Sequence, residues 1–132
     1  MQQGLAQAEA AAGRGEVPVG AVLVDPNTGE AVAVAGNRVI ELRDPTAHAE
    51  MLVIRAAAQA LGSERLDGLD LYVTLEPCAM CAAAISFARL RRLVYGAPDP
   101  KGGGVEHGAR VFDLATCHHK PEVIGGVAER QA

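Results

Sequence analysis

The sequence predicts a layered α/β domain whose central sheet mixes antiparallel and parallel strand pairs. A β-hairpin pattern near the amino terminus is followed by helical stretches that alternate with strands, and this order is typical of such a sheet. Apolar residues make up 49% of the 132 residues, which is enough to bury a core. Because the chain has no repeat, linker or low-complexity tract, we expect a single domain over residues 1–132.

The first half of the chain contains the signals for a helix, a hairpin and a second helix. An Ala-rich stretch favours the first helix, which ends at Gly13, and turn residues from Asp25 to Gly29 join the two hairpin strands. A polar loop over residues 43–46 surrounds Pro45, and Thr46 is a suitable N-cap for the second helix. The predicted elements are a helix over residues 5–12, strands over 17–24 and 31–35, and a helix over 47–61.

The second half alternates strand-like and helical stretches. Pro77 suits the first turn of a helix that runs to about Ala88, since proline lacks the N–H that a first turn leaves unpaired. We expect residues 96–104 to form a turn-rich loop and residues 113–117 to be the end of one more short helix. The predicted strands cover residues 69–75, 92–95 and 121–124.

Composition and charge limit the setting and the partners. No apolar run approaches the roughly 20 residues of a membrane span, and the amino terminus lacks the features of a secretory signal. Three cysteines cannot pair evenly, so we expect a reducing, cytoplasmic setting. The net charge of −4 gives no general affinity for nucleic acid, although a local patch can supply it. Six basic residues gather in the second half, as a binding patch or a solvated face: Arg89, Arg91, Arg92, Lys101, Arg110 and Lys120.

A pair of cysteines, Cys78 and Cys81, lies at the start of a predicted helix. Their spacing lets both sulfurs face one point, and the helix amino terminus favours the thiolates that bind metals. Taken alone, the pair could be a redox motif or half of a structural zinc site. The flanking Pro77 does not supply a thioredoxin-like context, and the only further cysteine, Cys117, is expected to be a small core residue. The third ligand should therefore come from elsewhere in the chain.

His48 is the candidate third ligand, and Glu50 lies two residues after it. On a regular helix, residues two apart point about 200° away from each other, so both can face one metal only from the first turn. The preceding Pro45 and Thr46 put them there. Three protein ligands leave one position for water, as in catalytic zinc sites. Zinc lowers the pKa of that water toward ~7, and Glu50, as a carboxylate outside the ligand set, can move its proton to a leaving amine.

The combination of His-Ala-Glu over residues 48–50 with Pro-Cys-Ala-Met-Cys over 77–81 resembles the zinc nucleoside and nucleobase deaminases. Longer segments are similar to the bacterial tRNA-specific adenosine deaminases within that group. They are residues 17–24, 36–38, 44–50, 71–78 and 94–97, together with Asp99 and Lys101. The likeness covers about residues 5 to 125.

This resemblance implies a fold, a cofactor and a reaction. The fold is three-layered, α/β/α, with a mixed five-stranded sheet. One zinc ion per chain is held by His48, Cys78 and Cys81, and Glu50 carries the protons. The family forms homodimers and deaminates adenosine to inosine at the wobble position of tRNA, so we expect an anticodon stem-loop as the substrate.

The same resemblance implies the residues that contact the substrate. Asn37 hydrogen-bonds the flipped base, for which its amide has both a donor and an acceptor, and Ala49 offers its backbone N–H to the base. Taken alone, Asn37 could instead be a turn residue. Asp99 and Lys101 lie in a loop similar to the family segment that touches the flanking nucleotides, although their local sequence by itself indicates only a turn.

Two departures from the family pattern concern the RNA and leave the chemistry untouched. The family continues past the last strand into a helix that grips the anticodon loop, whereas this sequence stops at Ala132. Pro98 stands where a basic residue can stand in the family. Two other hypotheses stay open: a deaminase of a free base or small nucleoside, such as guanine or cytosine, and a non-catalytic zinc-stabilised binding module. A purely structural site has no need of Glu50, which speaks against the module.

Overall fold

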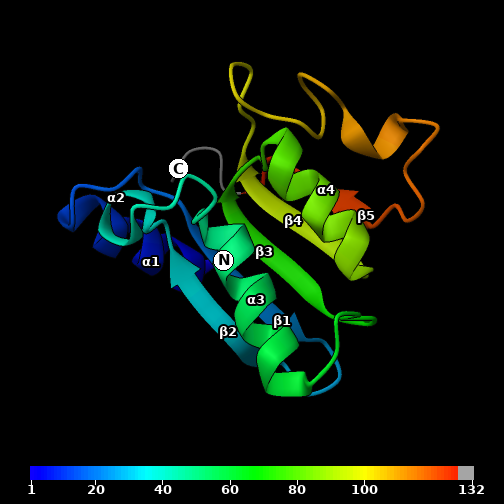
Figure 1. Cartoon of the computed structure of the whole chain (residues 1–132), viewed down its shortest axis with the longest axis horizontal. Coiled ribbons are helices and arrows are strands. Elements are labelled where there is room, and N and C mark those ends of the chain that lie inside the picture. Colours follow the sequence, from blue (N-terminus) through cyan, green and yellow to red (C-terminus); the bar gives the residue numbers. More distant parts are fainter. Residues whose placement is uncertain (128–132) are drawn as a thin grey trace.

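A mixed five-stranded sheet forms the centre of the structure (Figure 1). The structure is a computed structural model that describes residues 1–127, so the end of the expected domain, residues 128–132, lies outside the described residues. Its strands are β1 (Gly20–Asp25), β2 (Glu30–Gly36), β3 (Asp70–Leu75), β4 (Arg92–Ala97) and β5 (Glu122–Ile124). They follow the order β2-β1-β3-β4-β5, in which β1 is antiparallel to both neighbours and the last three strands are parallel.

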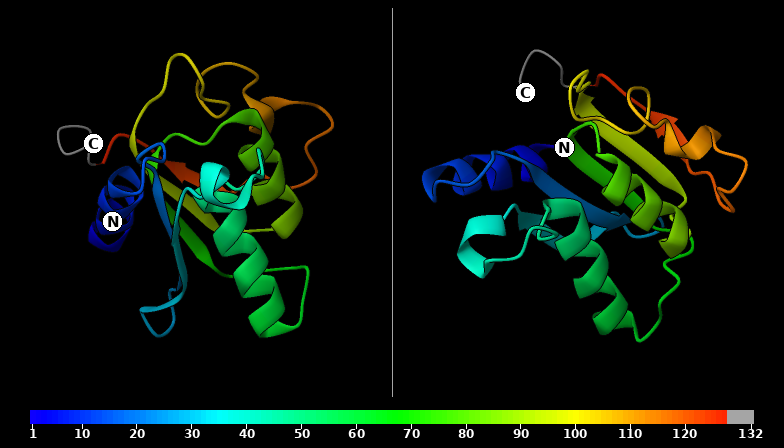
Figure 2. Two further views of the ribbon diagram at one scale, coloured as in Figure 1. Left: turned by 60° about the vertical axis from the view of Figure 1, so that its left-hand side comes forward. Right: turned by 45° about the horizontal axis from the view of Figure 1, so that its top comes forward.

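Helices cover both faces of this sheet, as the left view of Figure 2 shows. On one face, α1 (Gln2–Gly13) packs against β1 and β2. On the other face, α3 (Ala49–Leu61) and α4 (Ala79–Ala88) lie beside each other. The short α2 (Val39–Leu42) and the 3-10 helix η1 (Val111–Asp113) lie in the connections. The expected three-layer α/β/α fold with a mixed five-stranded sheet is confirmed.

Leucines from three adjoining strands form the centre of the core. Leu23 of β1 is the register partner of Leu71 of β3, which is in turn the partner of Leu93 of β4. All three are fully buried, in one cluster with Val53 of α3 and Ile85 of α4. Burying a side chain of this size stabilises a fold by about 1.5–3 kcal/mol. The sheet and both helices of this face are therefore held by one shared core.

The predicted hairpin and strands are confirmed, and the largest shift is at β1, which begins at Gly20 instead of residue 17. The residues before it form a turn, in which the Val19 N–H donates to the Val17 carbonyl at 2.8 Å, and α1 approaches the strand closely at Gly20. A Cβ on Gly20 would clash with the carbonyl of Gly4 in α1 and would lie 2.7 Å from the backbone nitrogen of Ala8. The Gly20 N–H also donates to Thr74 Oγ1 of β3 at 3.1 Å.

Two connections differ from the prediction. The sequence analysis missed α2, whose four residues are too few for a periodic pattern. This helix is capped from a distance, because the buried Glu16 carboxylate accepts hydrogen bonds from the N–H groups of Ile40 (3.1 Å) and Glu41 (2.9 Å). The predicted helix ending at residues 113–117 is wrong: η1 covers Val111–Asp113, and a turn follows it, in which the Cys117 N–H donates to the Leu114 carbonyl. Within residues 1–127, none of the helices combines the length and hydropathy that a bilayer span requires.

Candidate active site

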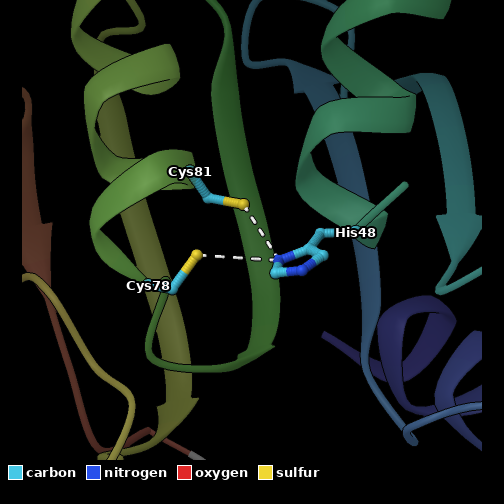
Figure 3. Close-up of side chains that lie close together, drawn as sticks. All are labelled: His48, Cys78 and Cys81. Carbon is cyan, nitrogen blue, oxygen red and sulfur yellow. Dashed lines mark hydrogen bonds between the residues drawn. The ribbon is translucent and has the colours of Figure 1, made fainter. Parts of the chain in front are cut away.

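Three side chains from two helix starts converge at one end of the sheet (Figure 3). His48 Nδ1 lies 3.6 Å from Cys78 Sγ and 3.5 Å from Cys81 Sγ. A zinc ion about 2.3 Å from a sulfur and about 2.0 Å from a nitrogen places these two atoms about 3.5 Å apart across a tetrahedral angle. The spacing of the three donor atoms therefore fits a single tetrahedral metal, with one protein nitrogen and two thiolates as ligands.

The positions of His48 and Cys78 follow from the ends of their helices. Each residue is the N-cap of its helix with an extended backbone, His48 before α3 and Cys78 before α4. Their carbonyls accept the first intrahelical hydrogen bonds, from Leu52 (3.0 Å) and Ala82 (2.9 Å). Both helix amino termini therefore point at the site, and their positive dipole ends favour thiolates and other anions there.

The predicted start of α3 is wrong by two residues, and the reason is local hydrogen bonding. Asp44 Oδ1 accepts from both the N–H (2.9 Å) and the hydroxyl (2.7 Å) of Thr46, so Thr46 closes a turn and does not cap the helix. His48 is the cap in its place. Pro77, which was expected in the first turn of α4, likewise precedes the cap Cys78. These shifts place Glu50 in the first turn of α3, as its expected role required.

The two thiols have different acidities in this geometry. A hydrogen bond from Cys81 lowers the pKa of Cys78 to about 5. The same hydrogen bond, together with burial, raises the pKa of Cys81. Cys78 therefore loses its proton more readily than Cys81, and a cation bound between the two sulfurs favours loss of the second proton.

Glu50 is a buried carboxylate beside these three donors. It is 4% exposed, and within residues 1–127 its Oε1 has no hydrogen-bond partner. Burial raises the pKa of Glu50 to about 7. A carboxyl group with a pKa in this range can both accept and donate a proton near neutral pH, which is what a general acid/base needs. Its free oxygen leaves room for a proton-bearing group of a substrate or a water.

A pocket of about 260 Å³ opens onto this carboxylate. Asn37, His48, Glu50, Cys78 and Asp99 are among its lining residues. The structure thus brings two of the three candidate metal ligands, the candidate proton carrier and two of the four expected substrate residues around one cavity, with the third ligand, Cys81, buried behind them. The metal-donor cluster and the cavity coincide, although larger cavities lie elsewhere on the molecule.

Asn37 and Ala49 contact each other in the structure. Asn37 Oδ1 accepts a hydrogen bond from the buried backbone N–H of Ala49 at 2.8 Å. The Ala49 N–H expected to face the base is therefore taken up by Asn37. Asn37 was also a possible turn residue, but its side chain is buried and lines the pocket.

Asp99 and Lys101 lie at the rim of the pocket. Asp99 lines it, and its Oδ1 accepts from the N–H groups of Lys101 (3.2 Å) and Gly102 (3.0 Å), which closes a turn. The side chain of Lys101 is exposed. The expectation of a turn in this segment is confirmed, and Lys101 is not among the pocket-lining residues.

Most of the clustered basic residues are paired with carboxylates. Arg91 binds the buried Asp70 through two nitrogens, at 2.8 and 2.6 Å. Arg92 pairs with Glu122, and Arg110 and Lys120 both pair with Asp113. Much of this set is therefore an ion-paired surface and not a free basic patch. Cys117 is half-buried against the core near Ser86, in agreement with the core assignment.

Sequence reasoning missed Glu76, the residue between β3 and the cysteine pair. Burial alone would raise the pKa of Glu76, but hydrogen bonds from the backbone N–H of Asp99 and from His107 outweigh it and lower the pKa to about 2. The only feature of the sequence that points to Glu76 is its place, as an acidic residue between a buried strand and the Pro-Cys motif. Its partners are 23 to 31 residues away in the sequence, so the pattern gave no indication of them.

Comparison with known proteins relates this geometry to one group. The profile of the cytidine and deoxycytidylate deaminase zinc-binding region matches residues 1–97. A tRNA-specific adenosine deaminase of Agrobacterium fabrum is 61% identical over 132 residues, which are 100% of this chain and 86% of that protein.

Solved structures give the same relationship. A structure from studies of A-to-I editing by tRNA:A34 deaminases at the wobble position of transfer RNA matches with a TM-score of 0.92 and 63% identity, and the match covers 96% of this chain and 95% of that one. A guanine deaminase from Bacillus subtilis matches with a TM-score of 0.70 and 39% identity, over 74% of this chain and 61% of that one.

Proposed function

The chain belongs to the zinc-dependent cytidine and deoxycytidylate deaminase family, and on this basis we propose that it converts adenosine to inosine at the wobble position of tRNA. The reaction is a hydrolysis, in which water replaces the amino group on C6 of adenine and ammonia leaves. The high identity to a tRNA-specific adenosine deaminase over the whole chain supports the adenosine substrate.

The observation that carries the catalytic part of the proposal is the free Oε1 of Glu50. This oxygen is buried and unpartnered within the described chain, and its residue lines the same pocket as His48 and Cys78. An unpaired buried carboxylate costs stability, so a fold with a purely structural metal site would be more stable without this residue. A proton carrier, in contrast, needs an oxygen that is free to meet its substrate.

We assign the zinc to His48 Nδ1, Cys78 Sγ and Cys81 Sγ, with one ion per chain. When bound, zinc with three protein ligands lowers the pKa of a water at its fourth position and so supplies hydroxide near neutral pH. Glu50 takes up the proton of the attacking water and passes it to the ring nitrogen or to the leaving amine. The neighbouring helix amino termini stabilise the negative charge that gathers here during the attack.

We assign substrate contacts to Asn37, Ala49, Asp99 and Lys101. Asn37 keeps its Nδ2 donors for an acceptor on the purine edge, since its Oδ1 is engaged by Ala49. The Ala49 N–H reaches the base only if this bond opens, so Ala49 acts chiefly by holding Asn37. We expect Asp99, which lines the pocket, and the exposed Lys101 to contact the nucleotides on either side of a flipped adenine.

The substrate, on this proposal, is a tRNA anticodon stem-loop and the enzyme works as a homodimer. A loop adenine leaves its stack more cheaply than a paired one, which suits a pocket that must enclose the base. A dimer is supported by exposed apolar surface on α4, where Phe87 is 75% exposed. All three cysteines are free thiols, which fits the cytoplasmic setting that we propose.

A second candidate is a guanine deaminase, which the match to the Bacillus subtilis enzyme favours. The test compares inosine and ammonia formed from an anticodon stem-loop bearing a wobble adenosine, from the same sequence as a full duplex, and from free adenosine, guanine and cytosine. We expect turnover of the stem-loop and little of the others, with binding that weakens as salt rises. Rapid release of ammonia from guanine, with no inosine in the stem-loop, would establish the second candidate instead.

A further inference from the structure

The Glu76 carboxylate gathers a loop that is distant from it in the sequence. Its side chain is fully buried. Oε2 accepts hydrogen bonds from three successive backbone N–H groups, those of Val105 (3.1 Å), Glu106 (2.9 Å) and His107 (3.1 Å). Oε1 accepts from the N–H of Asp99 (3.0 Å) and from Nδ1 of His107 (2.8 Å). Successive N–H groups that converge in this way form a nest for an anion, and here the anion belongs to the protein.

The glycines of this loop let it lie directly on Glu76 and on the start of α4. A Cβ on Gly103 would clash with Glu76 Oε2. The N–H of Gly104 donates to the carbonyl of Pro77 at 2.8 Å, and a Cβ on Gly104 would meet the backbone of Ala79. The segment over residues 98–107, which we call the rim loop, is thus bound at both Glu76 and Pro77, immediately before Cys78.

The rim loop also forms one wall of the pocket. Asp99 and Gly102 line the cavity together with His48 and Glu50. Asp99 is tied to Glu76 through its N–H, and it closes the turn that presents Gly102. The position of this wall relative to Glu50 therefore depends on the Glu76 carboxylate.

We propose that Glu76 is a positioning residue that holds the rim loop as the substrate-side wall of the pocket. It acts on substrate affinity through the loop and not on the metal. Among the contacts recorded for residues 1–127, Glu76 binds none of His48, Cys78 and Cys81 directly. The kinetic consequence rests on the proposed function, whereas the tethering of the loop does not.

Three variants and one control separate this role from general stabilisation. Glu76→Gln keeps the shape but turns an NH2 group toward the N–H donors. His107→Ala removes one hydrogen bond, and Gly103→Ala pushes the loop off a carboxylate that stays intact. The control is Asp70→Asn: Asp70 is the other buried carboxylate of this strand region, at the opposite end of β3, where it binds Arg91.

The first readout is cleavage by trypsin after Lys101 in the folded, zinc-loaded proteins. Lys101 lies in the rim loop and is exposed, so cleavage reports opening of the loop. Because hydrogen bonds to charged groups are strong, we expect Glu76→Gln and Gly103→Ala to be cut about tenfold faster than the parent protein. His107→Ala should be cut a few-fold faster, roughly in proportion to the one bond lost. Asp70→Asn should be cut at the parental rate.

The second readout is steady-state deamination of the anticodon stem-loop. Glu76→Gln and Gly103→Ala should raise KM about tenfold and leave kcat within about threefold, with full zinc content. The double variant Glu76→Gln/His107→Ala should have the same KM as Glu76→Gln alone, since both changes release the same loop. Should Glu76→Gln fail to fold, Gly103→Ala and His107→Ala carry the test.

Distinct outcomes would overturn the two parts of the proposal. An unchanged cleavage rate in Glu76→Gln and Gly103→Ala would show that the carboxylate does not hold the loop. Faster cleavage with an unchanged KM, or equal rises of KM in Asp70→Asn, would show that the loop is held but does not shape the pocket. If the parent protein leaves the stem-loop unmodified, the proposed function fails, and the cleavage rates still decide the tethering.

Discussion

Asn37 Oδ1 accepts a hydrogen bond from the backbone N–H of Ala49 at 2.8 Å, and this bond joins the end of β2 to the first turn of α3. Ala49 stands between His48 and Glu50, so the bond fixes the backbone that carries both side chains. The Oδ1 atom of Asn37 thus has a structural role, since it holds Ala49. The Nδ2 atom stays available as a hydrogen-bond donor at the pocket, which Asn37 lines.

Two substitutions of Asn37 separate the structural role of Oδ1 from the donor role of Nδ2. Asn37→Ala removes both and leaves the buried Ala49 N–H unpaired, so we expect the free energy of unfolding to fall by about 1–3 kcal/mol, measured in urea. Asn37→Asp keeps an acceptor for Ala49 but loses the Nδ2 donors, so stability should change less while deamination drops at least about tenfold. Near-parental turnover in Asn37→Asp would remove Asn37 from the base-binding residues.

The contact between Asn37 and Ala49 also marks the limit of sequence reasoning here. The spacing of His48 and Glu50 was sufficient to place both at the start of a helix, because residues two apart on a regular helix point away from each other. In the structure His48 is the N-cap of α3 and Glu50 lies in its first turn. The resemblance supplied roles for Asn37 and Ala49 separately. Their mutual bond depends on how β2 enters the loop before α3, and neither periodicity nor motif spacing contains that information.

Errors at the helix starts have the same origin. Thr46 is a residue type that often caps helices, but Asp44 accepts hydrogen bonds from its N–H and hydroxyl, the chain turns here, and the extended residue that caps α3 is His48. Local propensity cannot decide between two capping partners two residues apart. The role of Glu76 could not be predicted from the sequence, because the N–H groups that bind it belong to a glycine-rich loop whose path is set only in the folded chain.

The assignment of the zinc ligands predicts the metal content of two cysteine variants. Cys78→Ser replaces a thiolate ligand by a hydroxyl that stays protonated, so most of the zinc should be lost, as measured by elemental analysis after dialysis. Cys117→Ser is the matched control, because Cys117 lies against the core near Ser86 and should leave one zinc per chain. Full occupancy in Cys78→Ser would contradict the ligand set.

Substitutions of Glu50 should remove the proton transfer without removing the metal. Glu50→Ala is expected to keep zinc and fold but to lose about 10²–10⁴-fold in deamination rate, as for other general acid/base groups. Burial raises the pKa of Glu50 from 4.5 to about 7, so its cost to stability grows as pH rises from 4.5 to 7 and is complete above 7, where isosteric Glu50→Gln should be at least as stable as the parent. Turnover close to parental in either zinc-loaded variant would assign the proton transfer to another group.

The lowered pKa of Glu76 predicts how the free energy of unfolding changes at acid pH. Its pKa is lowered from 4.5 to about 2, chiefly by hydrogen bonds that overcome burial, so its contribution is complete above pH 4.5 and is lost as pH falls toward 2. The largest effect is about 3 kcal/mol. We expect urea unfolding of Glu76→Gln to depend less on pH in this window than unfolding of the parent. Parallel profiles for the two proteins would show that the carboxylate is not stabilised in the fold.

The proposed homodimer can be tested on α4. Its sequence, AMCAAAISFA, is apolar except for the buried Ser86, and one side already packs in the core through Ala82 and Ile85. On the other side Phe87 is 75% exposed, and it lines a cavity of about 170 Å³ with Val111 and Leu114. Apolar surface of this kind on a small domain is typical of a face that is covered by a partner.

Sedimentation at micromolar concentration should therefore give twice the chain mass of 13.6 kDa for the parent protein. Phe87→Glu would place a charge in the interface, and unpaired buried charges cost several kcal/mol, so the variant should sediment as a monomer. Val34→Glu is the control, because Val34 is 44% exposed on β2, at the far edge of the sheet from α4, and its substitution should leave the dimer intact. A parent protein that is monomeric and still active on the stem-loop would refute the dimer, and a dimeric Phe87→Glu protein would move the interface away from α4.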